Sequence, residues 1–326
     1  MTGAVRPDDR AISTVVDVTF ALLLVSASIA VLAIHITDDD AERDTLESEQ
    51  TAQTLSATTL RVEYSLQPVV DDPDYSGPSS PSSSELMRAS HGPVTDLLAA
   101  AAITRVRVAD DRVSQAGEDY LRKMQGNVRD ILTSADAKAH VVAVWRPYEG
   151  SAIQGRAEAG PAPPQGTDLR TVTLTVDSRI PSVSDGEIES RWATGDYGGV
   201  ARLLADAIVR GYFPRHQTQL VLERGGFQGA VATYRYERWK DRLDDWRGER
   251  SRPMGTWDDR GVDYDPNVAH LVDSSRPQVR KANDQLRAEL AADIKRELKD
   301  KYPSTSGEEL AEEITVGEVT ITVQTW

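Results

Sequence analysis

Side chains that could hold a metal ion or act as a nucleophile are thinly spread along this chain of 326 residues. There is no cysteine, which excludes thiolate metal sites and cysteine catalysis. No two histidines have the His-x-x-x-His spacing, and none pairs with a glutamate on one helical turn, so metal-dependent hydrolysis has no support. The histidines are His35, His91, His140, His216 and His270.

Motifs of acyl and nucleotide chemistry are missing as well. The chain has no G-x-S-x-G elbow, no G-x-x-x-x-G-K-[ST] phosphate loop and no G-x-G-x-x-G turn after a strand. Carboxylates are plentiful, but with 52 Asp and Glu they are expected as solvated surface. We therefore expect that the protein is not an enzyme.

One acidic segment has part of the spacing of a calcium loop. Asp263, Asp265 and Asn267 place oxygen ligands at positions 1, 3 and 5. The pattern then breaks, because Val268 stands where glycine makes the sharp turn and Ser274 where a glutamate closes the site. The segment is either a Ca²⁺ site or an accidental match on an acidic surface, and no other cofactor is expected.

The charge balance argues against nucleic acid as a partner. Lys and Arg number 37 against 52 Asp and Glu, which gives a formal net charge of -15. Phosphate backbones are bound by basic surfaces that release counterions, so the net charge has the wrong sign. Only 7 of the basic residues are Lys, and 32 of the acids are Asp. This composition resembles that of proteins from salt-loving archaea, where high ionic strength screens self-repulsion.

The elements that would position any of these residues begin with an uncharged run near the N-terminus. Residues 18–36 carry no formal charge over 19 positions, about 28 Å as a helix, which is close to the thickness of a bilayer core. Arg6 and Arg10 precede the run and Asp38 to Asp40 follow it, so the positive-inside rule places the N-terminus in the cytoplasm. We expect a single-pass protein of the cell membrane with its C-terminal part extracellular.

The junction before this run resembles the class III signal of haloarchaeal type IV pilin-like proteins. Arg10 and Ala11 stand where the family has a charged residue and a small one, and Ile12 opens the apolar segment. By this resemblance, prepilin peptidase cuts between Ala11 and Ile12, and the apolar segment then packs between subunits. Thr14 stands where the family often has proline.

Asp17 is the one acid inside the apolar stretch. A carboxylate there is costly and marks a functional position by default. The pilin resemblance implies an assembly role, pairing with the terminal amine of a neighbouring subunit, although Asp17 is the sixth residue after the expected cut and Val16 the fifth. The alternative is that Asp17 lies at the membrane interface within reach of water.

Hydrophobic periodicity defines the rest of the chain. We expect a leader at 1–11, a transmembrane helix with an outward helical extension at 12–58, and an extracellular α+β domain at 59–326. Its sheet is expected to be mainly antiparallel and accompanied by several helices, with a disordered-like loop at 71–85. A further loop is expected at 150–166. The aromatic residues of the helix after Gly225-Gly226 are expected to pack in the core; they are Tyr234, Tyr236, Trp239 and Trp246.

The sequence therefore favours a minor pilin-like or pseudopilin subunit of an archaeal surface-filament or secretion-type assembly. Its expected partners are the membrane, other pilin-like subunits and prepilin peptidase, with no nucleic acid. The first alternative is a permanently membrane-anchored extracellular binding protein, and the second a membrane-tethered hydrolase that uses Asp, Glu or Ser. A cleaved secretory signal ending near Ala33 would instead release a soluble protein.

Overall fold

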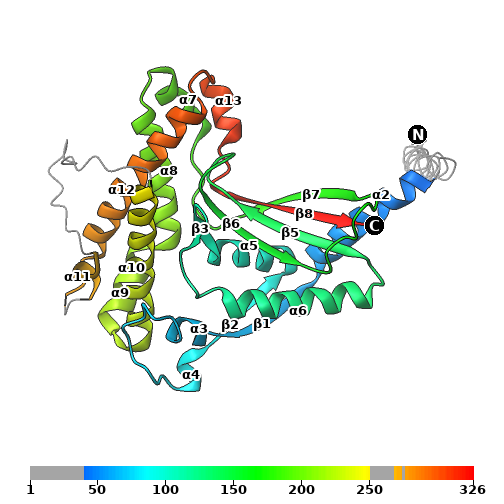
Figure 1. The fold of residues 1–326 in the computed structure, drawn as a ribbon, viewed down its shortest axis with the longest axis horizontal. Coiled ribbons are helices and arrows are strands. Elements are labelled where there is room, and N and C mark those ends of the chain that lie inside the picture. Colours follow the sequence, from blue (N-terminus) through cyan, green and yellow to red (C-terminus); the bar gives the residue numbers. More distant parts are fainter. Residues whose placement is uncertain (1–39, 250–267, 274–275) are drawn as a thin grey trace, which may run out of the picture.

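The computed structural model describes residues 40–249, 268–273 and 276–326, which form an α+β fold. A six-stranded antiparallel sheet carries helices on one face, and a second group of helices stands beside one end of it (Figure 1). The strands are β1 (Thr59–Ser65), β2 (Met87–Pro93), β3 (Val106–Val108), β4 (Asp111–Arg112), β5 (Ala139–Trp145), β6 (Ile153–Ala159), β7 (Arg170–Asp177) and β8 (Glu318–Thr325).

The described helices fall into two groups. One lies by the sheet and by the small β1–β2 pair: α2 (Asp40–Ala57), α3 (Gln67–Val70), α4 (Ser83–Leu86), α5 (Val94–Thr104) and α6 (Glu118–Ser134). The other is the helical layer: α7 (Asp185–Ala193), α8 (Tyr197–Tyr212), α9 (Arg215–Arg224), α10 (Gly226–Glu249), α11 (Val268–Val272), α12 (Val279–Lys301) and α13 (Gly307–Glu313).

The large sheet has the order β4-β3-β6-β5-β8-β7, with every neighbouring pair antiparallel. Strand β8 is the last in the chain and lies second from one edge, where it pairs with β5 on one side and β7 on the other. The C-terminal segment therefore completes the sheet, and β7 is left at one edge.

The two faces of this sheet differ because side chains alternate along each strand. On β8, Val319, Ile321 and Val323 are fully buried, whereas Thr320 is exposed and Thr322 half-buried. Helices α2, α5 and α6 pack on the apolar face, which we call the covered face (Figure 1). On the opposite face, the open face, none of the described helices packs in this way.

The fold class expected from the sequence needs a correction. The α+β class and the antiparallel sheet are confirmed, but the expected transmembrane helix is not found among the described residues. None of the helices within residues 40–249, 268–273 and 276–326 combines the length and the apolar character needed to cross a membrane. The uncharged run 18–36 lies outside the described residues. The helix that is described next to it, α2, is polar on its outer side and belongs to the sheet domain.

The loop expected at 150–166 was also wrong, because its first half forms strand β6. The small residues Gly155, Ala157 and Ala159 alternate inward here and give a weak hydrophobic signal. A Cβ on Gly155 would lie 2.2 Å from the carbonyl oxygen of Ala102, so the backbone of α5 sits directly on the strand. Gly155 is therefore required by this close approach and does not mark a turn.

Candidate functional site

The residues singled out from the sequence lie outside the described part of the chain. This holds for Arg10, Ala11 and Ile12 at the expected cleavage site, and for Asp17. It holds equally for the calcium candidates Asp263, Asp265 and Asn267. Within the described ranges, no group of three or more His, Asp or Glu side chains is arranged to hold a metal ion.

Helix α2 is the described element closest to the expected processing and assembly segment. It begins at Asp40, four positions after the uncharged run ends. Its buried side chains Ser48, Ala52 and Leu55 form one stripe with i, i+4, i+7 spacing, and the helix contacts β7 and β8 on the covered face. At Thr58 the chain passes directly into β1. Any force or contact that reaches the N-terminal segment is therefore transmitted to the sheet through α2.

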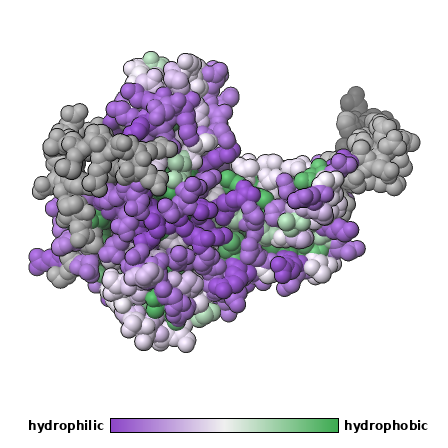
Figure 2. Space-filling view, in the orientation of Figure 1, coloured by the Kyte–Doolittle hydropathy of each residue, from purple (hydrophilic) through white to green (hydrophobic). Residues whose placement is uncertain are grey.

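The open face presents rows of threonine to solvent. Thr171, Thr173 and Thr175 of β7 are exposed, and the register places them opposite Gln324, Thr322 and Thr320 of β8. The next strand adds His140, Val142 and Val144 to the same face. Figure 2 shows hydrophobic patches over the sheet region, whereas the helical layer is mainly hydrophilic on this side. Between Thr171 and Thr175 this face carries no charge on β7 and β8. Charged side chains stand at its margins, with Asp177 opposite Glu318 and with Arg156 and Glu158 on β6.

The edge of the sheet beside this face is long. Strand β7 has eight residues, of which the six at 171–176 are Thr, Val or Leu, and it pairs only with β8 within the described structure. The opposite edge strand, β4, has only two residues. A long uncharged edge strand is a ready template for pairing with another chain, and short edges avoid this.

Buried polar pairs join the helical layer to the sheet. The Tyr148 hydroxyl, fully buried, donates to Glu297 Oε2 at 2.6 Å, and the Ala152 backbone N–H donates to the same oxygen at 3.3 Å. Burial raises the pKa of Tyr148, and the Glu297 carboxylate raises it further. The hydroxyl thus remains protonated as the donor, and Glu297 fastens α12 to the β5–β6 connection.

A second buried pair holds the helical layer together. Tyr236 donates its hydroxyl hydrogen to Asn283 Oδ1 at 2.5 Å, and Asn283 Nδ2 donates to the Phe213 carbonyl at 2.9 Å. The rings of Phe213 and Tyr236 are stacked with centroids 3.8 Å apart. Burial raises the pKa of Tyr236. These groups have no open approach and serve as structural contacts among α8, α10 and α12.

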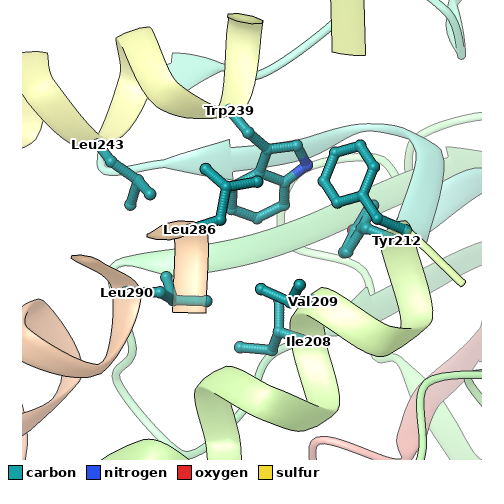
Figure 3. Close-up of a pocket in the computed structure, with 8 residues that line it drawn as sticks. Ile208, Val209, Tyr212, Trp239, Leu243, Leu286 and Leu290 are labelled. Atoms are coloured by element: carbon teal, nitrogen blue, oxygen red, sulfur yellow. The ribbon is translucent and has the colours of Figure 1, made fainter. Parts of the chain in front are cut away.

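The apolar space between the same three helices is too small for a ligand (Figure 3). Its volume is about 10 Å³, hardly the space of one water molecule. Side chains of α8, α10 and α12 surround it, and they include Ile208, Tyr212, Trp239, Leu243, Leu286 and Leu290. The expectation that the α10 aromatics pack in the core is confirmed, because Tyr234, Tyr236, Trp239 and Trp246 are at most 4% exposed.

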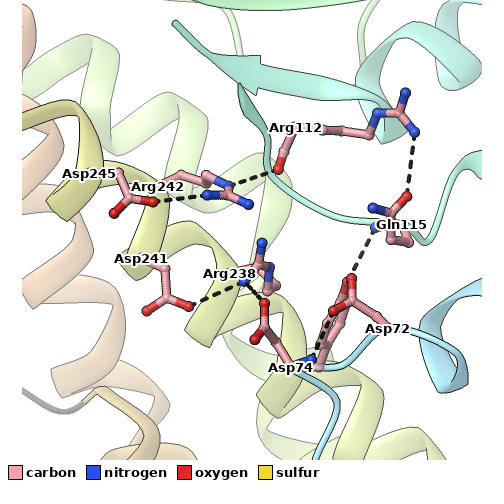
Figure 4. Close-up of polar contacts among 9 residues, drawn as sticks. Asp72, Asp74, Arg112, Gln115, Arg238, Asp241, Arg242 and Asp245 are labelled. Atoms are coloured by element: carbon pink, nitrogen blue, oxygen red, sulfur yellow. Dashed lines mark hydrogen bonds and ion pairs between the residues drawn. The ribbon is translucent and has the colours of Figure 1, made fainter. Parts of the chain in front are cut away.

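Polar contacts also tie the loop after α3 to helix α10 (Figure 4). The Tyr234 hydroxyl donates to Asp72 Oδ2 at 2.7 Å, and the Arg238 guanidinium forms a close ion pair with Asp74. One helical turn after Arg238, Arg242 Nε donates to the Arg112 carbonyl at 2.9 Å. Part of the loop that the sequence marked as disordered-like thus makes specific contacts with α10.

A shallow groove of about 510 Å³ lies beside α6, but its charges are internally paired. Glu118 forms a close ion pair with Arg112 and lies 3.7 Å from Arg105, while Asp119 accepts from Arg122 at 3.1 Å. Because Arg105, Arg112 and Arg122 already lie close to acidic side chains, the groove has no arginine in need of an anionic ligand.

Comparison with known proteins places this chain in a family of unknown function, DUF7284, whose model matches residues 16–326. Because the match covers nearly the whole chain, the protein belongs to this family. No curated protein and no solved structure matches it.

Proposed function

We propose that the protein is a minor pilin-like or pseudopilin subunit of an archaeal surface-filament or secretion-type assembly, with a structural role and no catalysis. In this proposal prepilin peptidase removes the leader after Ala11. The uncharged N-terminal sequence holds the chain at the cell membrane and later contacts other subunits, and the folded part lies outside the cell.

The observation that carries the proposal is the position of α2. It begins four positions after the end of the uncharged run, lies against an antiparallel sheet through Ala52 and Leu55, and leads straight into β1. A helix that joins an apolar N-terminal segment to a sheet domain suits a subunit whose apolar part packs among neighbours. This support rests on an analogy between the arrangement of these elements and that of pilin-like subunits.

Two further features favour a contact role. Between Thr171 and Thr175, the β7 edge and the adjoining part of the open face carry no charge, on a protein with a net charge of -15. The folded part is also large for a subunit repeated many times along a filament. A minor or tip component fits this size better.

The mature N-terminus of the native protein tests the proposal directly. Mass spectrometry of the terminal peptide should identify Ile12 as the first residue. A start at Met1 would favour a permanently anchored protein, and a start near Ile34 would indicate a released one. Either of these two results contradicts the proposal.

A matched pair of leader variants sharpens this test. Ala11→Leu removes the small residue at the expected cut and should leave the protein unprocessed and unassembled. Ala4→Leu makes the same change seven positions earlier and should be processed normally. Equal processing of both variants would contradict cleavage after Ala11.

The role of Asp17 is tested separately from cleavage. Asp17→Asn removes the charge that would pair with a neighbour's terminal amine, so the assembled fraction should fall while processing continues. If assembly is unchanged, Asp17 has no part in it.

A further inference from the structure

Arg235, in the middle of α10, has no acidic partner in the described structure. The two arginines that follow it on the same helix, Arg238 and Arg242, both have one. One turn later, Arg238 is close to Asp74 and lies 3.5 Å from Asp241; two turns later, Arg242 pairs with Asp245 at 2.8 Å. Within the described structure Arg235 makes no hydrogen bond or ion pair. The side chain of Arg235 is nevertheless half-buried.

The surroundings of Arg235 are aromatic hydroxyls. Burial lowers the pKa of Arg235, and the groups that oppose this shift are Tyr212, Tyr64 and Tyr236. The hydroxyls of Tyr212 and Tyr236 are already committed as donors, to the Ile103 carbonyl and to Asn283. A partly buried guanidinium without a counter-ion is unfavourable, because the charge loses solvation without gaining an attraction.

A second guanidinium stands at the same place. Arg88 on β2 is directly opposite Tyr64 on β1, so the two side chains share one face of this strand pair. Arg88 Nη1 donates to the backbone carbonyls of Glu85 and Met87, but its Nη2 is buried without a hydrogen-bond partner in the described structure. Burial raises the pKa of Tyr64, whereas the charges of Arg88 and Arg235 both lower it. Tyr64 also packs against the cluster that contains Phe227, Val231 and Tyr234 of α10, and Arg235 follows Val231 by one helical turn. Helix α10 thus brings the second cation to the side of β1 where Tyr64 lies.

We propose that Tyr64, Arg88 and Arg235 form a binding site for a tetrahedral oxyanion, phosphate or sulfate, free or as part of a phosphate ester. Two guanidinium groups match the charge of a dianion, and their N–H donors together with the Tyr64 hydroxyl match its oxygens. Arg235 keeps solvent-accessible surface, so an anion can reach it in place of water. The site joins β1, β2 and α10, and it does not depend on the proposed pilin-like role.

Titration calorimetry with inorganic phosphate tests the site on the full chain in mild detergent, at ionic strength held constant with sodium chloride. The wild type should bind one phosphate per chain. Arg235→Gln should weaken binding by at least about tenfold, since a charge-assisted contact is lost. Arg242→Gln removes an arginine of the same helix that already has acidic and carbonyl partners, and it should leave binding unchanged.

Tyr64→Phe keeps the ring that packs on Tyr120 and removes only the hydroxyl, so it keeps the test decisive if Arg235→Gln folds poorly. It should weaken phosphate binding a few-fold. Tighter binding of glycerol 1-phosphate than of inorganic phosphate would assign the site to a phosphate ester, and equal binding to the free ion. The proposal is overturned if the wild type shows no saturable binding, or if the Arg235 and Tyr64 variants bind as the wild type does.

Discussion

The two faces of the six-stranded sheet use the same strands for different purposes. Along β8, Ile321 is fully buried beneath helices on the covered face, while its neighbour Thr320 is exposed on the open face. The covered face supplies the burial of apolar area that holds the domain together. The open face contributes little to stability, so its side chains can serve contacts with other molecules. Substitutions on the two faces should therefore separate folding from assembly.

The largest difference is expected between neighbouring positions of β8. Ile321→Ala should lower the free energy of unfolding by about 4 kcal/mol, because it leaves a cavity beneath the helices. Thr320→Ala, one residue earlier, should change it by less than about 0.5 kcal/mol. Denaturant unfolding of both variants measures the difference. Similar losses would mean that the open face is covered in the protein as it occurs in solution.

A somewhat smaller loss is expected where α2 meets the covered face. Leu55 is fully buried, so Leu55→Ala should cost about 3 kcal/mol of unfolding free energy. Thr54→Ala changes the exposed side of the same helical turn and serves as the control. If Leu55→Ala unfolds at the same denaturant concentration as the control, α2 does not belong to the folded domain.

The link between the sheet and the helical layer should have an intermediate effect. Tyr148→Phe removes the donor to buried Glu297 and should cost about 2 kcal/mol, because the carboxylate loses a short hydrogen bond. Tyr302→Phe removes a hydroxyl that donates to the Glu149 carbonyl at 2.8 Å in an exposed position, and it should cost much less. Thermal unfolding of the pair distinguishes a structural link from a surface contact.

The smallest effect, with opposite sign, is expected at Glu237 on α10. Burial raises its pKa, and the nearby Asp241, Asp273 and Asp74 raise it further. A raised folded-state pKa stabilises the protein below the unfolded value of 4.5, and this contribution is lost as the pH rises through the folded pKa. At pH 7, Glu237→Gln should therefore raise the Tm by about 1 °C. The gain should vanish in acid, and high salt should reduce only the part that comes from the neighbouring acids. A lower Tm would mean that the carboxylate has a favourable partner.

Regular periodicity explains which parts of the fold the sequence predicted. The i, i+4 spacing of Leu286, Leu290, Ile294 and Leu298 is typical of a helix that faces the core, and in α12 all four side chains are at most 2% exposed. The alternation of Val172 and Leu174 with threonines is typical of a half-buried strand, which the structure has as β7. Strand β6 was missed because its inward residues are too small to produce a clear hydrophobic pattern.

The candidate sites depend on contacts that no local pattern contains. Tyr148 and Glu297 are 149 positions apart and meet only when α12 packs beside the β5–β6 connection. In the sequence, Arg235 is one of 30 arginines, and only the fold sets it apart by bringing Tyr64 near it while no acid pairs with it. The residues proposed for cleavage and assembly, Arg10 to Ile12 and Asp17, lie outside the described structure.

The way in which α2 is held has a mechanical consequence. Its buried side chains from Ser48 to Leu55 rest along the sheet, and the helix continues into β1 through Thr58. A pull on the N-terminal segment along the helix axis would load these contacts in shear, together and not one after another. The sheet would then share the tension across β7 and β8.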